Sequence, residues 1–346
     1  MKSTNTLMMG VAVLAFAGLA VAQVPEFQYT VQTWGSYTQF DQAKANTGDE
    51  TTTQLGFGLR RLFLRGKMTV GDLTTFVQYS ATDNKVLDAR LDYKLSDKLT
   101  LRAGRYVGAG SQAGARTPHT AIDFIERSMV ARNWGTILNR GDFRTYGVSL
   151  LGKAGQFYYE ATVHNGDGGL NLRPYNTTSN NSDEDTGLAP QLDLLAGLKL
   201  KNGFHAGFHY GLPNEKRINV SHMTGFVYFE PKDYGKGDFR AKVDLASLTD
   251  KRGAVDVTSM GYAVAGFFRI CDRMELGARY ESWDPDTDMD KDAYGDVTVG
   301  VSYAPNPDKW AENLFKLAAT FKTHQGDNRP YDPLTVYVMW QVYMHK

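Results

Sequence analysis

Hydrophobic and polar side chains alternate regularly along residues 86–105. Over 87–95, leucine, alanine and tyrosine occupy one parity, and aspartate, arginine and lysine occupy the other. Successive side chains of a β-strand point to opposite faces, so this pattern predicts a strand with one apolar and one charged face. Residues 96–98 turn the chain before the alternation resumes. The stretch therefore predicts a hairpin whose arms are about ten residues long, the length that a tilted strand needs to cross a bilayer.

Similar segments recur along the rest of the chain, and we expect about sixteen strands in all. They are predicted at 26–40, 55–67, 73–81, 86–95, 99–107, 143–151, 157–165, 192–200, 204–212, 220–230, 239–248, 259–270, 274–283, 297–304, 314–323 and 334–344. The alternation slips around Arg60 and Arg61, which indicates a β-bulge. The connection at 108–141 breaks the rhythm, and we expect a short helix within it at 121–131.

The lengths of the connections indicate which ends of the strands face the outside of the cell. Short turns at 96–98, 201–203 and 271–273 alternate with long polar connections at 41–54, 108–141, 166–190 and 284–294. Outer-membrane barrels have short periplasmic turns and longer external loops. A soluble closed barrel of this strand number would enclose a space too wide for side chains to fill. The prediction is therefore an all-β, transmembrane antiparallel β-barrel with apolar side chains toward lipid and charged side chains in the lumen, while a two-layer sandwich is the open alternative.

The N-terminus has the features of a secretory signal. Lys2 supplies a positive charge, 7–19 is an apolar stretch, and Ala20-Val21-Ala22 is a small-residue cleavage sequence. We expect a signal peptide at 1–22 and a single barrel domain at 23–346. Cys271 is the only cysteine, which excludes a disulfide framework. Lys+Arg and Asp+Glu both total 38, so the chain has no global basic field to attract nucleic acid.

The candidate functional residues gather in and around the connection at 108–141. Arginine's planar fork suits phosphate or carboxylate, so the basic residues there are candidates for contact with anions at a pore constriction. The alternative is that charge pairs simply fasten the connection to the barrel wall. Candidates for the anion contact are Arg116, Arg132 and Arg140 in the connection with Arg60, Arg61 and Arg102 on the wall, and the candidates for fastening are Asp123, Glu126 and Arg127.

No metal site or catalytic residue is predicted. The alternating aspartates of 284–292 depart from an EF-hand loop, because Lys291 and Val297 stand where glycine and glutamate are required. His205 and His209 share a parity but need a third ligand from elsewhere to hold a metal. No serine motif accompanies them, so we expect neither a cofactor nor enzyme activity.

Several motifs resemble the phosphate-selective porin (P/O-type) family. They are LRRLFLRGKM (59–68), LDARLDYKLSDKLTLRAGRY (87–106), DFIERS (123–128), YEATVHNGDG (159–168), RYESWDPDTD (279–288) and DVTVGVSYAPN (296–306). The resemblance implies a sixteen-stranded outer-membrane barrel, usually trimeric, whose third external loop (here 108–141) folds inward as a constriction. Phosphate-specific members use arginines and a lysine near that constriction, whereas this chain has no lysine between Lys98 and Lys153.

The expected function is passive diffusion of small hydrophilic solutes or ions through a water-filled barrel with a mild anion preference. We expect this porin in the outer membrane of a Gram-negative-type bacterium, as a homotrimer in contact with lipid and lipopolysaccharide. A phosphate or polyphosphate channel is one alternative. A barrel that anchors surface loops without an open pore is another, and a secreted soluble β-rich binding protein is a third.

Overall fold

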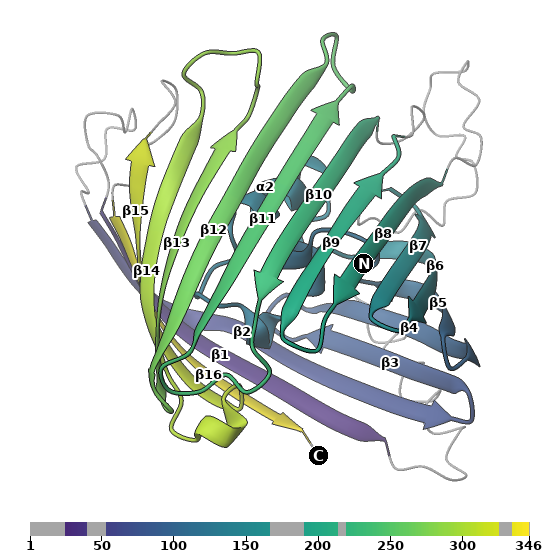
Figure 1. Ribbon diagram of the computed structural model, residues 1–346, viewed down its shortest axis with the longest axis horizontal. Coiled ribbons are helices and arrows are strands. Elements are labelled where there is room, and N and C mark those ends of the chain that lie inside the picture. Colours follow the sequence, from purple (N-terminus) through teal and green to yellow (C-terminus); the bar gives the residue numbers. More distant parts are fainter. Residues whose placement is uncertain (1–24, 40–52, 167–189, 214–218, 325–333, 346) are drawn as a thin grey trace.

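The computed structural model describes residues 25–39, 53–166, 190–213, 219–324 and 334–345. The expected signal peptide at 1–22 and nearly all of the expected connections at 41–54 and 166–190 lie outside these residues. The described chain forms a closed barrel of sixteen tilted strands with a few short helices inside or beneath it (Figure 1). None of the described helices is long and apolar enough to span a membrane.

The strands follow one another around the barrel in sequence order. They are β1 (Glu26–Gln39), β2 (Thr53–Val70), β3 (Leu73–Ser80), β4 (Lys85–Ser96), β5 (Leu99–Tyr106), β6 (Thr145–Ala154), β7 (Phe157–His164), β8 (Gln191–Lys199), β9 (Phe204–Gly211), β10 (Val220–Phe229), β11 (Phe239–Asp250), β12 (Val257–Cys271), β13 (Met274–Asp284), β14 (Tyr294–Tyr303), β15 (Asn313–His324) and β16 (Leu334–His345). The helices are η1 (Gln112–Arg116), η2 (His119–Ala121), α2 (Met129–Ile137) and η3 (Pro307–Lys309).

Every neighbouring pair of strands is antiparallel, and β1 pairs with β16 along twelve residues to close the sheet. The prediction of a sixteen-stranded antiparallel barrel is confirmed. Closure gives every strand a hydrogen-bonded neighbour on both sides, so none is an edge strand. A barrel of this strand number is wide enough to contain an aqueous space.

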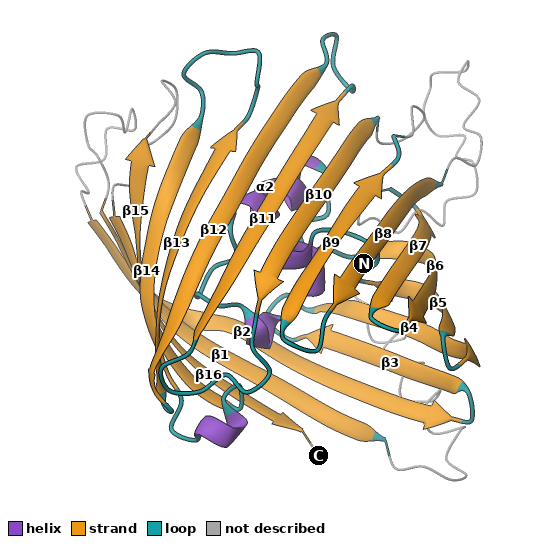
Figure 2. Ribbon diagram, in the orientation of Figure 1, coloured by secondary structure: helices purple, strands orange, loops and turns teal. Residues whose placement is uncertain are grey.

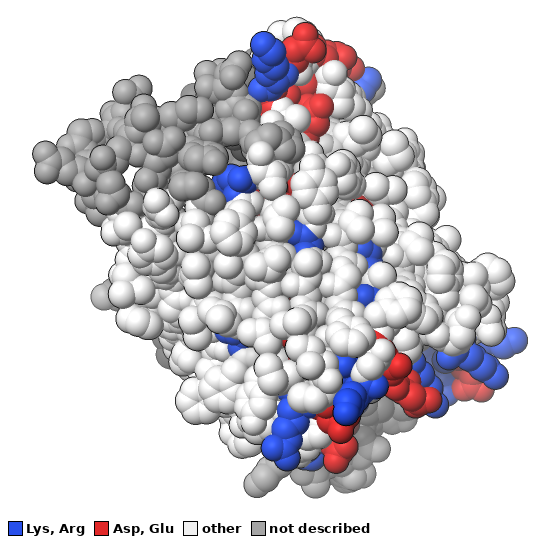
Figure 3. Space-filling model, turned by 60° about the vertical axis from the view of Figure 1, so that its left-hand side comes forward, with Lys and Arg blue, Asp and Glu red and all other residues white. Residues whose placement is uncertain are grey.

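The outer surface is an apolar belt. Phe208, Val264 and Leu317 are 52%, 46% and 46% exposed, although they lie in the middle of strands. Their neighbours of opposite parity face the interior, where charged residues such as Asp193 and Glu281 are buried. On the face that Figure 3 shows, Lys, Arg, Asp and Glu gather at the two ends of the barrel, and the broad band between them has only a few small basic patches. This distribution is typical of a transmembrane barrel.

The predicted bulge at Arg60 and Arg61 is confirmed. Gln32 of β1 pairs with Arg61 and Thr33 pairs with Leu59, so Arg60 is an extra residue in β2. Consecutive residues of a regular strand would point to opposite faces. Because the bulge interrupts that alternation, both arginines make contacts inside the barrel.

A second bulge corrects one assignment made from parity. Gln78 of β3 pairs with Asp88 and Tyr79 pairs with Val86, so Leu87 is the extra residue in β4. Its parity with Leu91 placed Leu87 on the apolar outer face, but its side chain is only 2% exposed.

The short helix predicted at 121–131 is wrong in position, because α2 covers Met129–Ile137 (Figure 2). Ser128 sets the start of α2, since its side chain accepts a hydrogen bond from the Ala131 N–H and caps the first turn. Before it, Asp123 and Glu126 pair with Arg240 and Arg60 of the barrel wall. Sequence periodicity could not reveal those distant partners.

We predict that an arginine at the middle of the apolar belt destabilises the barrel, because its charge would lie in hydrocarbon. Val264→Arg on β12 should lower the free energy of unfolding in lipid vesicles by about 2–4 kcal/mol. The matched control is Val255→Arg in the turn before β12, where the wild-type side chain is 75% exposed. Denaturant titration of both variants is the measurement, and equal losses would contradict a lipid-facing belt.

Candidate functional site

The chain between β5 and β6, which we call the inner segment (residues 107–144), lies inside the barrel. It contains η1, η2 and α2, and the strands surround these helices (Figures 1 and 2). Helix α2 packs against β11, β12 and β13. Its apolar side and the residue after it, represented by Val130, Trp134 and Leu138, form a buried cluster with the wall residues Val220, Leu248 and Trp283.

Two carboxylates of the inner segment are bound to opposite sides of the wall. The carboxylate of Asp123 lies 2.5 Å from Arg240 and 3.0 Å from Lys242, both on β11. The carboxylate of Glu126 lies 2.5 Å from Arg60 on β2. Eight strands separate β2 from β11 in one direction and six in the other, so the inner segment crosses the lumen.

Both carboxylates are held in the ionised form. Burial would raise the pKa of Asp123, but Lys242 and Arg240 outweigh it and hold the pKa below its usual range. Burial also acts to raise the pKa of Glu126, and its hydrogen bond with Arg60 more than offsets that effect. The two pairs therefore persist throughout the neutral pH range.

Backbone groups add further attachments. Lys316 of β15 donates to the carbonyl oxygens of Ile122 and Asp123, the latter at 3.0 Å. The N–H of Met129, at the start of α2, donates to Glu281 of β13 at 2.7 Å. Because these groups would otherwise be unpaired, such bonds lower the cost of placing a short irregular segment inside the barrel.

The arginines of the inner segment have different roles in the structure. Arg116 donates to Glu160 of β7 at 2.6 Å. Arg127, expected to fasten the segment to the wall, instead donates to the carbonyl oxygens of Ala113 and Thr117 within the segment. Arg132 is exposed, and none of the described residues pairs with its guanidinium. Each of these three remains inside the barrel region, but they do not form one cluster.

The contacts of Arg140 differ from the anion-contacting role expected from the sequence. Its guanidinium lies 2.8 Å from Asp193 of β8 and also donates to the carbonyl oxygen of Gly166 at 2.8 Å. The residue is 2% exposed, so a solute in the lumen cannot reach it. Arg140 attaches the inner segment to the wall.

A strongly basic cavity lies between the inner segment and the wall strands β16 and β1–β5. Its volume is about 470 Å³, and we call it the arginine cavity. Six arginines line it, opposed by two aspartates: Arg65, Arg90, Arg102, Arg116, Arg127 and Arg144, with Asp88 and Asp142. Of the expected anion-contacting residues, Arg102 and Arg116 meet here. Arg60 and Arg61 do not line it, because Arg60 is bound to Glu126 and Arg61 donates to Gln32 at 2.9 Å.

Three members of the arginine cavity were missed as site residues by the sequence analysis, namely Arg65, Arg90 and Arg144. The available signal was their position on or next to strands expected to present polar side chains to the lumen. Strand parity identifies the inner face, but it does not say which inner side chains lie at the height of the inner segment. That height depends on the register of the whole barrel.

Part of the positive charge in this cavity is not neutralised by contact. Arg102 pairs with Asp92 and Arg144 pairs with Asp88, at 2.6 and 2.7 Å. By contrast, the described acceptors of Arg65 are neutral: it donates to Gln78 and to Thr30, each at 2.7 Å. Arg127 is likewise bonded to carbonyl oxygens. The cavity therefore combines arginines paired with carboxylates and arginines bonded to neutral oxygens among the described residues.

A second cavity of about 390 Å³ lies on the other side of the inner segment, against β10–β15. It shares Arg116, Thr117, Pro118 and Thr120 with the arginine cavity. Its charged lining is more balanced: the bases are Arg116, Arg240, Lys242, Arg269 and Lys316, and the acids are Asp123, Glu230 and Glu275. Arg116 thus faces both spaces across the segment.

We predict that Asp123→Asn loosens the inner segment without opening the barrel. Removing one partner of a buried ion pair costs about 3–5 kcal/mol, and we expect about 2 kcal/mol here because Glu275 and Glu230 still pair with Arg240 and Lys242. Hydrogen exchange of the α2 amides measures the loss. Asp97→Asn, at an exposed turn where Asp97 pairs only with Lys94 among the described residues, is the matched control and should leave α2 protection unchanged.

The same attachments predict a pH dependence. A carboxylate whose pKa is lowered on folding contributes stability that is present above its unfolded value and is lost as the pH falls through its folded value. The ordinary values are 3.8 for Asp123 and 4.5 for Glu126, and both are lowered. Hydrogen-exchange protection of the inner segment should therefore stay constant from neutral pH to about 5 and fall only below about 4. A decline that begins near neutral pH would contradict the role of these two pairs.

Comparison with known proteins identifies the fold. No protein-family model matches the chain, and no curated protein matches it significantly. The loop-L8 deletion mutant of OmpT, an outer membrane protein of Vibrio cholerae, is 14% identical, with a TM-score of 0.62 over 93% of this chain and 99% of that one.

Two further structures show the same likeness. The anion-selective porin from Comamonas acidovorans is 13% identical, with a TM-score of 0.61 over 93% of this chain and 99% of that one. A mutant of Rh. blastica porin is 10% identical, with a TM-score of 0.53 over 92% of this chain and 100% of that one. At these identities the likeness establishes the fold alone, so the closer resemblance to phosphate-selective porins stays a prediction. The chain therefore has the fold of an outer-membrane porin-type β-barrel.

Proposed function

We propose that this protein is an outer-membrane porin through which small hydrophilic solutes diffuse passively, with a preference for anions. The observation that carries the proposal is the arginine cavity, in which six arginines and two aspartates line an internal space inside a barrel with an apolar exterior. A charged internal surface is the feature that distinguishes a hydrated passage from a packed protein core.

The mechanism requires no chemical step. The inner segment crosses the lumen and leaves a cavity on each side, so it restricts the size of solutes that pass. Unpaired positive charge at Arg65 and Arg127 raises the local concentration of anions and lowers that of cations. Two unit charges about 5 Å apart in water interact by about 0.8 kcal/mol, which changes a local ion concentration about fourfold.

General anion preference fits the residues better than a dedicated phosphate channel does. Arginine guanidinium groups can bind phosphate or carboxylate through two parallel hydrogen bonds. However, the lysines nearest the inner segment are already engaged: Lys242 pairs with Asp123, and Lys316 donates to the segment's backbone. The phosphate or polyphosphate channel therefore remains the second candidate. The Comamonas porin, described as anion-selective, supports the first by analogy of fold.

We propose further that the chain is exported with a cleaved signal peptide to the outer membrane of a Gram-negative-type bacterium. There the apolar belt contacts lipid, and the charged outer end contacts lipopolysaccharide. One of the similar structures is a trimer form of OmpT, which supports a homotrimer for this chain. We assign no catalytic role to its residues.

The competing proposal is a barrel that anchors surface loops and conducts nothing. Purified protein in a planar bilayer separates the two. Our proposal predicts stepwise conductance, in groups of three if the trimer inserts as a unit. A folded protein that leaves the bilayer silent would favour the anchor and reject the porin.

The charge mechanism predicts the effect of Arg65→Gln. This change removes one positive charge and leaves no carboxylate unpaired, because the described partners of Arg65 are neutral. The ratio of chloride to potassium permeability, obtained from reversal potentials in a salt gradient, should fall about two- to fourfold at low salt. Lys251→Gln, which removes an exposed charge paired with Asp256 outside the lumen, should leave the ratio unchanged. Equal ratios in the wild type and Arg65→Gln would reject the mechanism.

A further inference from the structure

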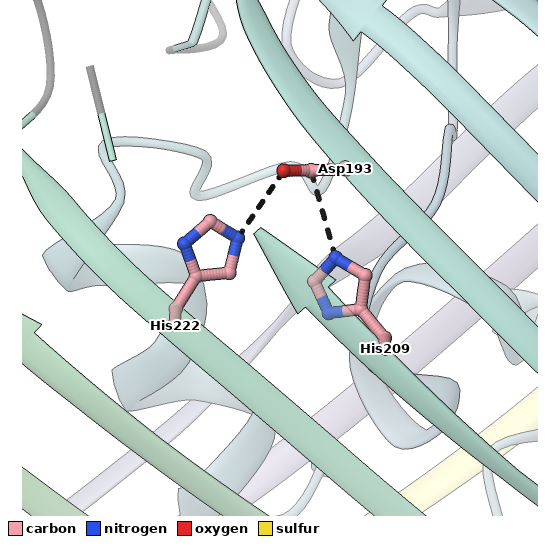
Figure 4. Close-up of side chains that lie close together, drawn as sticks. All are labelled: Asp193, His209 and His222. Atoms are coloured by element: carbon pink, nitrogen blue, oxygen red, sulfur yellow. Dashed lines mark ion pairs between the residues drawn. The ribbon is translucent and has the colours of Figure 1, made fainter. Parts of the chain in front are cut away.

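Three side chains on adjacent strands converge at one point of the inner wall. Asp193 lies on β8, His209 on β9 and His222 on β10, and all three side chains are fully buried. One ligand atom from each lies within 4.8 Å of the others. Figure 4 shows a ring nitrogen of each histidine directed at the carboxylate of Asp193. Among the described residues, this is the one group of three or more histidine, cysteine or acidic side chains with such a spacing.

The strand register explains why they can meet. Asp193 and His222 both pair with Gly211 of β9, from either side. A Cβ at position 211 would lie 2.1 Å from the His222 ring and 2.7 Å from the Asp193 carboxylate. The missing side chain therefore provides the space into which both groups project. His209 lies two residues earlier on the same face of β9 and completes the cluster.

The facing atoms have no hydrogen-bond partners. The Nε2 atoms of both histidines and Oδ1 of Asp193 are buried and unpaired. Nε2 of His209 lies 3.6 Å from Oδ2 of Asp193, and Nε2 of His222 lies 3.5 Å from Oδ1. Both distances are too long for a good hydrogen bond. Buried polar atoms without partners cost free energy. A ligand bound between these atoms would remove that cost.

The far sides of the two rings are held by other partners. Nδ1 of His222 lies 3.4 Å from the carbonyl oxygen of Val220, which can only accept, so Nδ1 carries the proton. The Nε2 atom of the neutral ring then presents a lone pair to the cluster. Nδ1 of His209 lies 3.4 Å from the hydroxyl of Thr224, which can accept in the same way. Outer partners of this kind orient the histidine ligands of metal sites.

The two carboxylate oxygens of Asp193 have different surroundings. Its Oδ2 atom lies 2.8 Å from Arg140 and 3.1 Å from His164, and these groups keep it a carboxylate. Its Oδ1 atom faces His222, whereas His209 lies nearer to Oδ2. The positive charge of Arg140 opposes a second cation nearby, but the same guanidinium fixes the carboxylate in position.

We propose that Asp193, His209 and His222 form a binding site for a divalent transition-metal ion, with Zn²⁺ as the best fit. Two imidazole nitrogens and one carboxylate oxygen are a ligand set that zinc accepts, whereas Ca²⁺ and Mg²⁺ require oxygen ligands. Bonds of about 2.0–2.1 Å in a tetrahedron separate the ligand atoms by about 3.3–3.4 Å. The 3.5 Å from His222 to Oδ1 is close to that value, His209 lies 3.6 Å from the other oxygen of the same carboxylate, and one ligand atom from each residue lies within 4.8 Å of the others.

The metal would act on the position of the inner segment. Trp134 of α2 meets the rings of His209 and His222 edge-on, with centroids 5.9 and 5.8 Å apart. Arg140, just after α2, is bound to Asp193 itself. An ion at this point joins β8, β9 and β10 and fixes the two rings against which Trp134 packs.

Sequence spacing alone did not reveal this site. It paired His209 with His205, which shares its parity but lies elsewhere on β9 and is bonded to the hydroxyl of Tyr158 at 2.7 Å. The ligands that complete the set come from β8 and β10, and only the strand register brings them together.

The test uses the full-length folded protein in detergent micelles, treated with a chelator and then titrated with zinc chloride. We expect one zinc per chain to remain after gel filtration, measured by elemental analysis, and excess Mg²⁺ not to displace it. His209→Gln and His222→Gln should each weaken binding by more than about 100-fold, beyond the loss typical for an outer partner. His205→Gln is the matched control on the same strand and should bind as the wild type does. A folded wild type that retains no zinc, or an equal loss in His205→Gln, would overturn the proposal.

A second measurement does not depend on the variants folding. Zinc K-edge absorption of the loaded wild type should show nitrogen and oxygen neighbours at about 2.0–2.1 Å, with the outer-shell scattering of two imidazoles. A spectrum without imidazole scattering would reject these ligands. Conductance recordings on the same samples keep this result separate from the porin proposal, because a barrel can conduct whether or not it binds zinc.

Discussion

The structure depends on the closure of its hydrogen-bond ladder between β1 and β16. In hydrocarbon, every backbone N–H and C=O must find a partner within the protein, and a closed ring of sixteen strands meets this need because each strand has a neighbour on both sides. Once the ring is closed, the alternation of side chains assigns every residue to lipid or to the interior. The exposed Leu317 and Val264 and the buried Glu281 are consequences of this one constraint. An interior that is too wide to fill with side chains can then hold charged groups and a folded segment.

The inner segment shows how charge serves attachment inside such a barrel. Two buried apolar clusters, one around Trp134 and one around Phe124 and Ile125, hold parts of the inner segment against the wall. Its polar groups are bound to the wall as well: Asp123 by Arg240 and Lys242, Glu126 by Arg60, and carbonyl oxygens by Lys316. Burying these charges is tolerable because each has a partner of opposite sign or a hydrogen bond, which compensates for lost hydration.

The sequence was sufficient for features that depend on neighbours along the chain. The sixteen strands, the antiparallel order and the bulge at Arg60 follow from local alternation and its interruption. The sequence was not sufficient where distant strands decide the outcome. The position of α2 depends on the cap at Ser128 and on wall contacts before it, and the burial of Leu87 depends on its pairing with β3. The grouping of Arg65, Arg90 and Arg144, like that of Asp193 with His222, arises from register across several strands, which parity does not encode.

The distinction between paired and unpaired arginines links the fold to the proposed selectivity. If every lumen cation were opposed by a carboxylate, as Arg102 is by Asp92, the interior would be crowded with charge but nearly neutral to a passing ion. Arg61, Arg65 and Arg127 differ, because their described partners are the neutral oxygens of Gln32, Gln78, Thr30, Ala113 and Thr117. Such bonds hold the guanidinium in place without cancelling its field. One residue type therefore has two surroundings in this barrel: arginines such as Arg60 pair with carboxylates of the inner segment, and the proposed anion preference rests on arginines such as Arg65 whose partners are neutral.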